Sequence, residues 1–500
     1  MRLIGRRAFG TVLVCGLAWL TGCAVGPRYA RPASPTPSDF KETPPNWKEA
    51  QPSDQILRGK WWEIYQDPQL NALEEKIDVS NQTLKASEAQ FRQARAMVRY
   101  NRADLFPTIS TGVSATRERF SSNRPLSDLS GGGTFNDLVL PVDMSYEPDV
   151  WGKVRRTVEA ARANAQATFA DLQSVSLSLH AELAIDYFQA RELDAEAKLL
   201  DSTVVAYQRS LELNENRYRG GVVSQVDVAQ AQTQLENARS QSIDVKEQRT
   251  QFEHAIAVLV GEPAPSFTLP VVALNAIPPV IPPGLPSELL ERRPDIASSE
   301  RQMAAANANV GVAKAAYFPL FNFSPSAGFE STAVSNWLSN PSSFVSVGVS
   351  AMVTVFDVGR RRAALDQARA VYDQTVAGYQ QNVLVAYQEV EDNLAALRLL
   401  EQEAITQTAA VTAAEHSLDL SKNRYTGGVT TYLEVITAQT TALGDERTAV
   451  QVSGRRMVAS VLLVKALGGG WDAASLAKLD LTSRKPYSPQ PPTPASPTGQ

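Results

Sequence analysis

The chain has 500 residues, of which 43% are hydrophobic and 20% charged, and its formal net charge is −5. This balance excludes a disordered acidic tail and a collagen-like repeat, and the lack of a basic excess argues against nucleic acid as a partner. The three histidines lie far from one another and from the two cysteines, Cys15 and Cys23, so the sequence shows no Cys/His cluster for a zinc ion and disfavours a Cys–His catalytic pair. No glycine-rich phosphate-binding motif occurs, and we therefore expect no cofactor, no metal and no enzymatic activity.

The N-terminus has the pattern of an export signal that ends in a lipid anchor. Arginines within residues 1–7 precede an apolar run at 8–20, which is too short to span a membrane as a helix. The run ends in Leu-Thr-Gly-Cys23, which resembles the lipobox of bacterial lipoproteins and implies cleavage after residue 22 and acylation of Cys23. Ala24 follows the cysteine in place of aspartate, which favours sorting to the outer membrane. Residues 23–60 then form a lipidated, extended segment; the alternative is a plain signal peptide with an incidental cysteine.

A duplication organises the rest of the chain. Residues 216–222, Asn-Arg-Tyr-Arg-Gly-Gly-Val, recur at 423–429 as Asn-Arg-Tyr-Thr-Gly-Gly-Val, an offset of 207 positions. The first repeat spans 61–262 and the second 295–468. A proline-rich connector at 263–294 joins them, and 469–500 form an equatorial end followed by a disordered tail.

Each repeat is expected to contain a short helix and a long helical hairpin. The long proline-free stretches have apolar residues at steps of three and four, and in the second repeat Val376, Val383, Val390 and Leu397 are spaced by sevens, which predicts a coiled-coil seam. Each stretch is interrupted once, by a glycine pair, which predicts turns near 218–224 and 425–431. An outgoing helix of about 70 residues would be about 100 Å long.

Four segments instead alternate apolar and polar residues with a period of two, which is typical of β-strands. They are 107–120, 137–148, 319–330 and 343–356. They suit strands of an outer-membrane barrel, and the alternative is a soluble β-layer with its apolar face on a core. Because four strands cannot close a barrel and open edges are not viable in lipid, a barrel would have to be shared by several chains.

Several strings together carry a family resemblance. They are residues 23–29, Trp61-Trp62, 289–296 (LLERRPDI), 356–360 (FDVGR) and the two Arg-Tyr-x-x-Gly-Val turns. With them the mature chain resembles the TolC-like outer-membrane factors of tripartite (RND-type) efflux systems, in the NodT-like lipoprotein branch. The resemblance implies a mainly α protomer with a membrane β part, built from four barrel strands and long coiled-coil hairpins. It also implies a homotrimer with a twelve-stranded barrel in the outer membrane, whose periplasmic tip docks an adaptor protein and an inner-membrane RND-type pump.

The resemblance places the gate at the two glycine-pair turns. Tyr425 matches a gate tyrosine and Glu434 an acidic pore-lining position, and Tyr218 and Asp227 are their counterparts in the first repeat. Carboxylates repeated around a narrow axis would favour cations and respond to pH. The alternatives are tyrosines that pack as coiled-coil knobs and carboxylates on ordinary solvated helix faces.

The chain departs from other members at Thr430 and Thr437, where some carry aspartate. We expect the four glycines of the turns to supply left-handed backbone geometry at little cost. The residues expected to shape the turns and contact the adaptor are Arg217, Arg219, Gly220, Gly221, Val222, Arg424, Gly427, Gly428 and Val429.

The resulting hypothesis is a passive exit duct for small molecules such as drugs or toxic compounds. One rival is an exit duct for type I protein secretion. Duct sequences separate the two poorly, although the lipobox and the NodT-like strings favour small-molecule efflux. Another is a periplasmic coiled-coil tethering lipoprotein, which would not need the four alternating segments.

Overall fold

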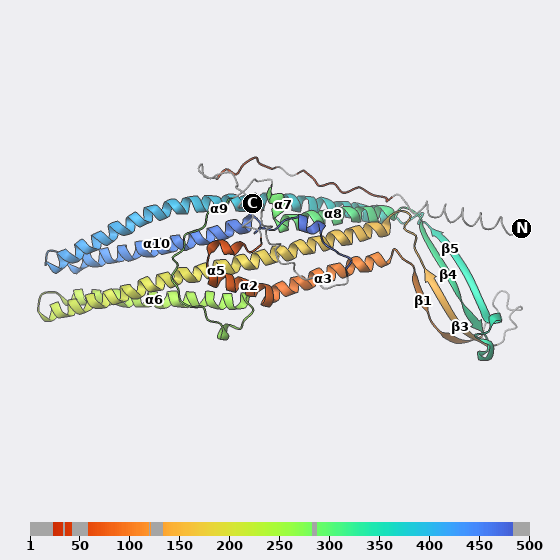
Figure 1. Ribbon diagram of the computed structural model, residues 1–500, viewed down its shortest axis with the longest axis horizontal. Helices are drawn as coiled ribbons and strands as arrows, with labels where there is room; N and C mark the ends of the chain where they lie inside the picture. The colour runs from red at the N-terminus through yellow and green to blue at the C-terminus, as the bar shows by residue number, and fades with distance from the viewer. Residues whose placement is uncertain are drawn as a thin grey trace, which may run out of the picture.

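The computed structural model describes residues 24–33, 36–42, 59–119, 121, 134–282 and 288–483. The expected signal segment 1–22, the lipidation candidate Cys23 and the tail 484–500 lie outside the described residues. The described chain is long and narrow: the strands lie at one end, the glycine-pair turns at the other, and helices run between them (Figure 1).

The helices repeat with the offset seen in the sequence. The two outgoing helices, α5 and α9, have 67 residues each, and the two return helices, α6 and α10, have 35 each. Among the described residues, none of the helices is both long and apolar enough to cross a bilayer. The helical elements are η2 (Trp61–Tyr65), α2 (Pro68–Ser80), α3 (Gln82–Ala103), α5 (Lys153–Arg219), α6 (Gln225–Leu259), η3 (Ala264–Ser266), α7 (Leu289–Arg292), α8 (Pro294–Ala315), η5 (Val334–Asn336), η6 (Asn340–Ser342), α9 (Arg360–Thr426), α10 (Tyr432–Ala466) and α11 (Ala474–Ala477).

Local chemistry explains where these helices begin and break. The first repeat has two short helices rather than the one expected, because Asn81 leaves helical geometry at ψ 125° and its side chain accepts the Leu84 N–H at the start of α3. Both long helices start after a glycine in the left-handed region: Gly152 has φ +80° and Gly359 has φ +84°.

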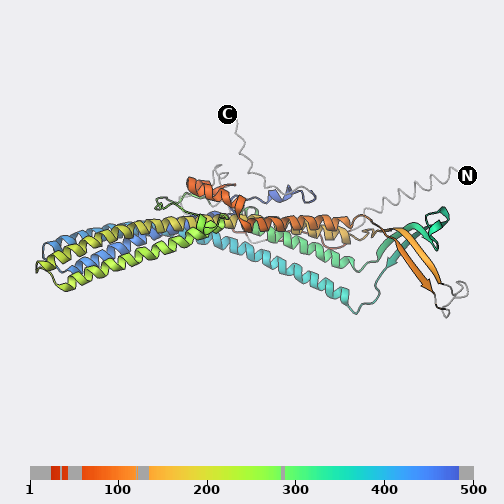
Figure 2. The ribbon, with the colours of Figure 1, turned by 90° about the horizontal axis from the view of Figure 1, so that it is seen from below.

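The strands form one antiparallel sheet that joins the two repeats. Its order is β1-β3-β4-β5, and β2 also pairs with β3. The strands are β1 (Thr108–Thr111), β2 (Ser114–Arg119), β3 (Thr134–Ser145), β4 (Leu320–Ser331) and β5 (Ser343–Met352). Among the described strands the sheet does not close on itself, so β5 and the β1/β2 side are open edges. Figure 2 shows the sheet beyond the helix ends from a perpendicular direction.

The strand expected at 107–120 is divided into β1 and β2, although the register to β3 continues unchanged across the break. In that register Gly112 lies opposite Pro141, which has no N–H to donate to the ladder. On its other side Pro141 pairs with Gly328, where an added Cβ would lie 2.1 Å from the Leu140 carbonyl oxygen. The division is therefore a local effect of one proline, and β1 and β2 act as one strand.

The largest apolar core lies at the middle of the long axis, where α2 packs against α5 and η2 reaches α10. Trp61, Trp62 and Tyr187 are buried there, and the Tyr65 hydroxyl is 2.9 Å from the Ser460 hydroxyl of α10. We call this middle region the waist, and the two hairpins extend from it toward the tip.

The N-terminal segment runs along the second repeat. Gly26 crosses α8 so closely that an added Cβ would lie 2.5 Å from the Cα of Gly311. Further along, Tyr29 donates to Glu300 of α8, and the Arg31 guanidinium donates to the Tyr379 hydroxyl of α9 at 3.1 Å. Burial beside the Glu300 carboxylate raises the pKa of Tyr29, which keeps the phenol protonated as a donor.

Candidate gate and docking site at the helical tip

The turns at the tip are two copies of one capping motif. In the first, the Val222 N–H donates to the Arg217 carbonyl at 2.8 Å and the Gly221 N–H to the Tyr218 carbonyl at 2.9 Å, a Schellman pattern. The second copy repeats both bonds at 2.9 and 3.0 Å. These bonds satisfy carbonyl groups that the helix end would otherwise leave unpaired.

Only one glycine of each pair has the left-handed geometry expected of both. Gly221 has φ +73° and Gly428 has φ +74°, whereas Gly220 and Gly427 have φ −79° and −74°. The expectation was wrong for Gly220 and Gly427, because the motif needs positive φ at a single position and the residue before it still has helical angles.

Tyr425 connects the two hairpins of one chain. Its side chain is 5% exposed, and its hydroxyl donates to the Asn214 side chain of α5. Arg217, also on α5, donates to the Tyr425 carbonyl at 3.1 Å and places its guanidinium carbon 4.7 Å from the centre of the Tyr425 ring. Burial raises the pKa of Tyr425, although the Arg217 charge lowers it in part. The first hairpin thus holds Tyr425 by its ring, its hydroxyl and its backbone.

Tyr425 is also part of an apolar seam between the hairpins. Its ring lies 5.2 Å from that of Tyr432, and both belong to a buried cluster with Tyr207, Leu211 and Leu235 of the first hairpin. Burial raises the pKa of Tyr432 to about 12. Tyr425 therefore packs into the apolar seam as a coiled-coil knob and also makes polar contacts with the first hairpin.

Tyr218, the counterpart of Tyr425, lies in a different environment. Its side chain is 46% exposed and stands outside the buried cluster. The duplication is thus broken at this pair.

The two acidic candidates also differ. The Asp227 carboxylate accepts the backbone N–H of Ser224 at 3.0 Å and its hydroxyl at 2.9 Å, so it caps the start of α6. Glu434 instead accepts from the Thr430 hydroxyl and lies 3.8 Å from the Arg424 guanidinium. Asp227 therefore caps the start of its helix, whereas Glu434 contacts Thr430 and Arg424 on either side of its turn.

Glu434 lines a shallow groove of about 470 Å³ between α9 and α10. Small side chains form most of its wall, and Thr437 lies one turn beyond Glu434. The lining residues are Ala414, Ser417, Ser421, Thr431, Leu433, Glu434, Thr437, Ala438 and Thr441. The groove places Glu434 and Thr437 on one accessible face of the second hairpin.

The outermost tip residues project away from the fold. Val222 and Val429 are both largely exposed, and Arg219 contacts Asn216 of its own helix at 2.6 Å. Apolar side chains held out on rigid turns, with arginines beside them, suit contact with another protein.

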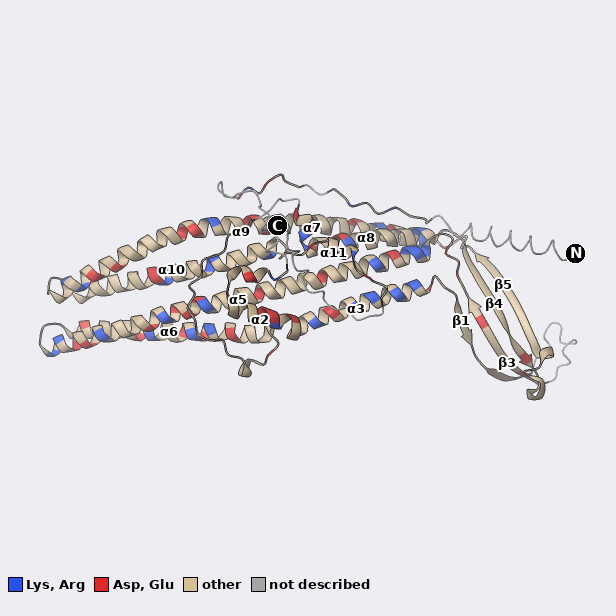
Figure 3. Cartoon of the chain, viewed as in Figure 1, with Lys and Arg blue, Asp and Glu red and all other residues tan. Residues whose placement is uncertain are grey.

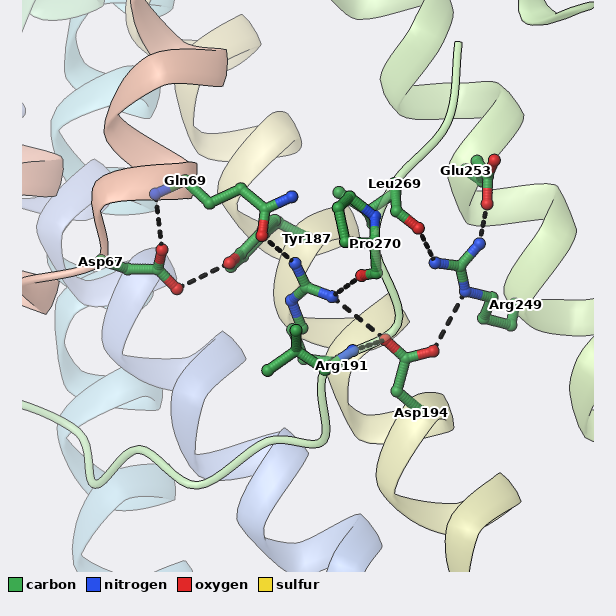
Figure 4. A network of polar contacts seen from close by, with 10 residues as sticks. Asp67, Gln69, Tyr187, Arg191, Asp194, Arg249, Glu253, Leu269 and Pro270 are labelled. Carbon is green, nitrogen blue, oxygen red and sulfur yellow. Dashed lines mark hydrogen bonds and ion pairs between the residues drawn. The ribbon is translucent and has the colours of Figure 1, made fainter.

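A buried polar network at the waist has no counterpart among the expected sites (Figure 4). Tyr187, Arg191 and Asp194 lie on one face of α5, and the Asp194 carboxylate accepts from Arg191 and from Arg249 of α6, both at 3.1 Å. The connector joins through the Val272 N–H, which donates to Asp194 at 3.0 Å. The network ties both helices of the first hairpin to the connector. Its sequence signal is a run of polar residues at steps of four and three in an alanine-rich helix.

A second buried cluster ties α2 to α5. The His180 ring stacks on Trp62 at 4.4 Å between ring centres, and its nitrogens lie 2.7 Å from Glu74 and 3.3 Å from Asp78. Burial alone would lower the pKa of His180, but the hydrogen bonds to Asp78 and Glu74 outweigh it and raise that pKa to about 9. For the Glu74 carboxyl, burial has the opposite sign and raises the pKa to about 7, although the hydrogen bond and the charge of His180 lower it in part. Within the described residues, no group of three or more His, Cys, Asp and Glu side chains is placed to hold a metal.

Comparison with known proteins gives a consistent result. The profile of the family described as outer membrane efflux protein matches residues 74–262 and 285–469. The chain is 30% identical over 462 residues to the toluene efflux pump outer membrane protein TtgC of Pseudomonas putida, covering 90% of this chain and 93% of that one. It is 30% identical over 460 residues to the pyoverdine export outer membrane protein OpmQ of Pseudomonas aeruginosa, with coverages of 90% and 96%. The solved outer-membrane channel OprN superposes with a TM-score of 0.84 at 30% identity, covering 90% of this chain and 100% of that one.

Proposed function

The chain belongs to the outer membrane efflux protein family and is an outer-membrane efflux channel, and we propose that three copies assemble into one passive exit duct. The open sheet carries this proposal. Its unpaired edges, β5 and the β1/β2 side, would leave backbone N–H and C=O groups without partners in lipid. Pairing edge to edge around a threefold axis would satisfy both edges of every copy at once.

We propose that the chain is also anchored by lipid on Cys23. The next residue, Ala24, lies against Gly152, and the Val25 N–H donates to the Trp151 carbonyl at 3.0 Å. This contact is at the junction between helices and sheet, so an acyl chain on Cys23 would enter the same membrane as the strands. Acylation adds apolar area that favours insertion.

The helical end is proposed to reach a periplasmic adaptor protein and, through it, an inner-membrane RND-type pump. The exposed Val222, Val429, Arg219 and Arg424 with their turns would form the docking surface. The contacts of Arg217 and Asn214 with Tyr425 would hold the tip closed, and Glu434 would line the opening. Asp227 would support the turn as a helix cap.

The duct would carry small molecules and would catalyse no covalent reaction, with no cofactor beyond the lipid. Relatives named for antibiotic efflux, toluene efflux and pyoverdine export support this cargo over the proteins of type I secretion. The sheet and its open edges favour a duct over a periplasmic coiled-coil tether.

Single-channel current through the purified, lipidated protein in a planar bilayer tests the duct and the gate together. We expect a small, cation-leaning conductance that rises when Tyr425→Ala and Glu434→Ala are combined. A conducting protein that is indifferent to these changes would contradict the gate, and a protein without conductance would contradict the duct.

A further inference from the structure

Positive charge gathers where the helices meet the sheet, on a chain whose net charge is negative (Figure 3). We call this the basic collar and define it by five exposed side chains. They are Arg102 of α3, Lys153 of α5, Lys314 of α8, and Arg360 and Arg362 of α9. Strands β1, β3, β4 and β5, which continue from these helix ends, contain no lysine or arginine. Among the described strands only β2 carries basic residues, Arg117 and Arg119, and it follows β1 on the side away from α3. The collar is therefore separated from these two arginines by strand segments without positive charge.

The fold explains only part of this charge. Arg102 and Lys314 lie at the C-terminal ends of their helices, where the helix dipole favours a cation. Lys153, Arg360 and Arg362 lie in the first turns of α5 and α9, where the dipole disfavours one. Both repeats place basic residues at these unfavourable starts.

Neighbouring acids compensate weakly for the three disfavoured charges. Lys153 is 47% exposed and reaches Glu147 at 3.2 Å, and Arg362 is 86% exposed and 4.0 Å from Asp366. The ion pairs described in the first turns of α9 involve Arg361, Arg362 and Arg369, and none of them involves Arg360. Exposed pairs of this kind stabilise a fold by little. Lys153 and Arg362 are thus only weakly paired, so these cations can still attract an anion outside the chain.

The surroundings of the collar have the character of a membrane boundary. Trp151 and Phe318 stack at 4.8 Å between ring centres, and the Trp151 indole donates to the Pro319 carbonyl at 2.8 Å. Phe106 and Phe356 are largely exposed at the same junction. Aromatic residues of this kind concentrate at the headgroup level of membranes.

We propose that the basic collar binds the phosphate groups of anionic phospholipids in the membrane leaflet that faces the periplasm. The proposal rests on the sheet lying in the outer membrane, as proposed above. Lysine and arginine next to a membrane-spanning element are attracted to anionic headgroups over about a Debye length. Bound lipids would offset the cost of cations at the helix starts and would fix the depth of the duct in the bilayer.

Native mass spectrometry of the lipidated protein tests this proposal. The protein is released from mixed bilayers and titrated with cardiolipin, with phosphatidylethanolamine and with inorganic phosphate. We expect cardiolipin to be retained in preference to phosphatidylethanolamine. Combining Lys153→Gln, Arg360→Gln and Arg362→Gln should weaken cardiolipin binding at least about tenfold.

A matched control removes the same charge elsewhere on the helices. Arg239→Gln, Lys246→Gln and Lys422→Gln alter exposed bases of the tip half and should leave cardiolipin binding unchanged. Equal loss in both triple variants, unchanged binding in the collar variant, or full competition by inorganic phosphate would overturn the proposal. Oligomer mass and conductance measured on the same samples separate this outcome from a failure of the duct itself.

Discussion

The contact between Arg217 and Tyr425 allows a quantitative test of the tip as a gate. Arg217→Met keeps the apolar stem and removes both the hydrogen bond to the Tyr425 carbonyl, at 3.1 Å, and the guanidinium 4.7 Å from the ring. A partly exposed cation–π contact contributes about 0.5–1 kcal/mol and a hydrogen bond about 1 kcal/mol. The closed tip should therefore lose about 1–2 kcal/mol per chain, which changes an equilibrium about 5- to 30-fold.

Single-channel recording in planar bilayers measures that change as an increase in open probability. Arg219→Met is the matched control, because Arg219 contacts only Asn216 of its own helix among the contacts that the structure describes. It should leave the open probability unchanged. The reasoning is refuted if Arg217→Met has no effect or if both variants open the channel equally.

Three further changes test the turns and the waist. Gly221→Ala should lower the unfolding midpoint by the equivalent of about 1 kcal/mol, because the backbone φ at this position is +73°. Gly220→Ala should leave the midpoint unchanged, because φ there is −79°. Equal effects of the two changes would contradict the turn geometry. Protonation of His180 stabilises the fold in full below pH 6.5, and this contribution is lost as pH rises through about 9, so unfolding midpoints should fall over that range by the equivalent of about 3 kcal/mol. His180→Gln should flatten this pH profile and the exposed His416→Gln should not; an unchanged profile in His180→Gln would exclude the pair as its source. Asp194→Asn leaves the buried Arg191 guanidinium without its carboxylate and takes one of two carboxylates from Arg249, which keeps Glu253. It should destabilise by about 3 kcal/mol in chemical unfolding, so a neutral result would show that the network contributes little.

The long hairpins could be predicted from the sequence because their signals are local and occur twice. The heptads and glycine pairs led to two hairpins, and the structure has helices of 67 and 35 residues in each. The turn chemistry was predicted too broadly, since Gly220 and Gly427 have ordinary helical angles. Period-two alternation located the strands, but it could not show that Pro141 would divide the strand opposite it.

The tip contacts depend on residues that are distant in the sequence. Nothing local to Tyr425 indicates that Asn214 and Arg217 of the other hairpin hold it, so the difference between Tyr425 and Tyr218 emerges only in three dimensions. One local signal was available: Ser224 and Asp227 have the spacing of a capping box, which predicts the bond that the structure shows. The Asp194 network likewise needs the connector to return to α5, which periodicity does not encode.

The mass of the lipidated protein, determined by native mass spectrometry in detergent, tests the central claim most directly. If the open edges of the sheet pair between copies, the protein is a trimer, and the same preparation conducts ions in a planar bilayer. A monomer or a dimer would leave β5 and the β1/β2 side unpaired and would contradict the shared barrel.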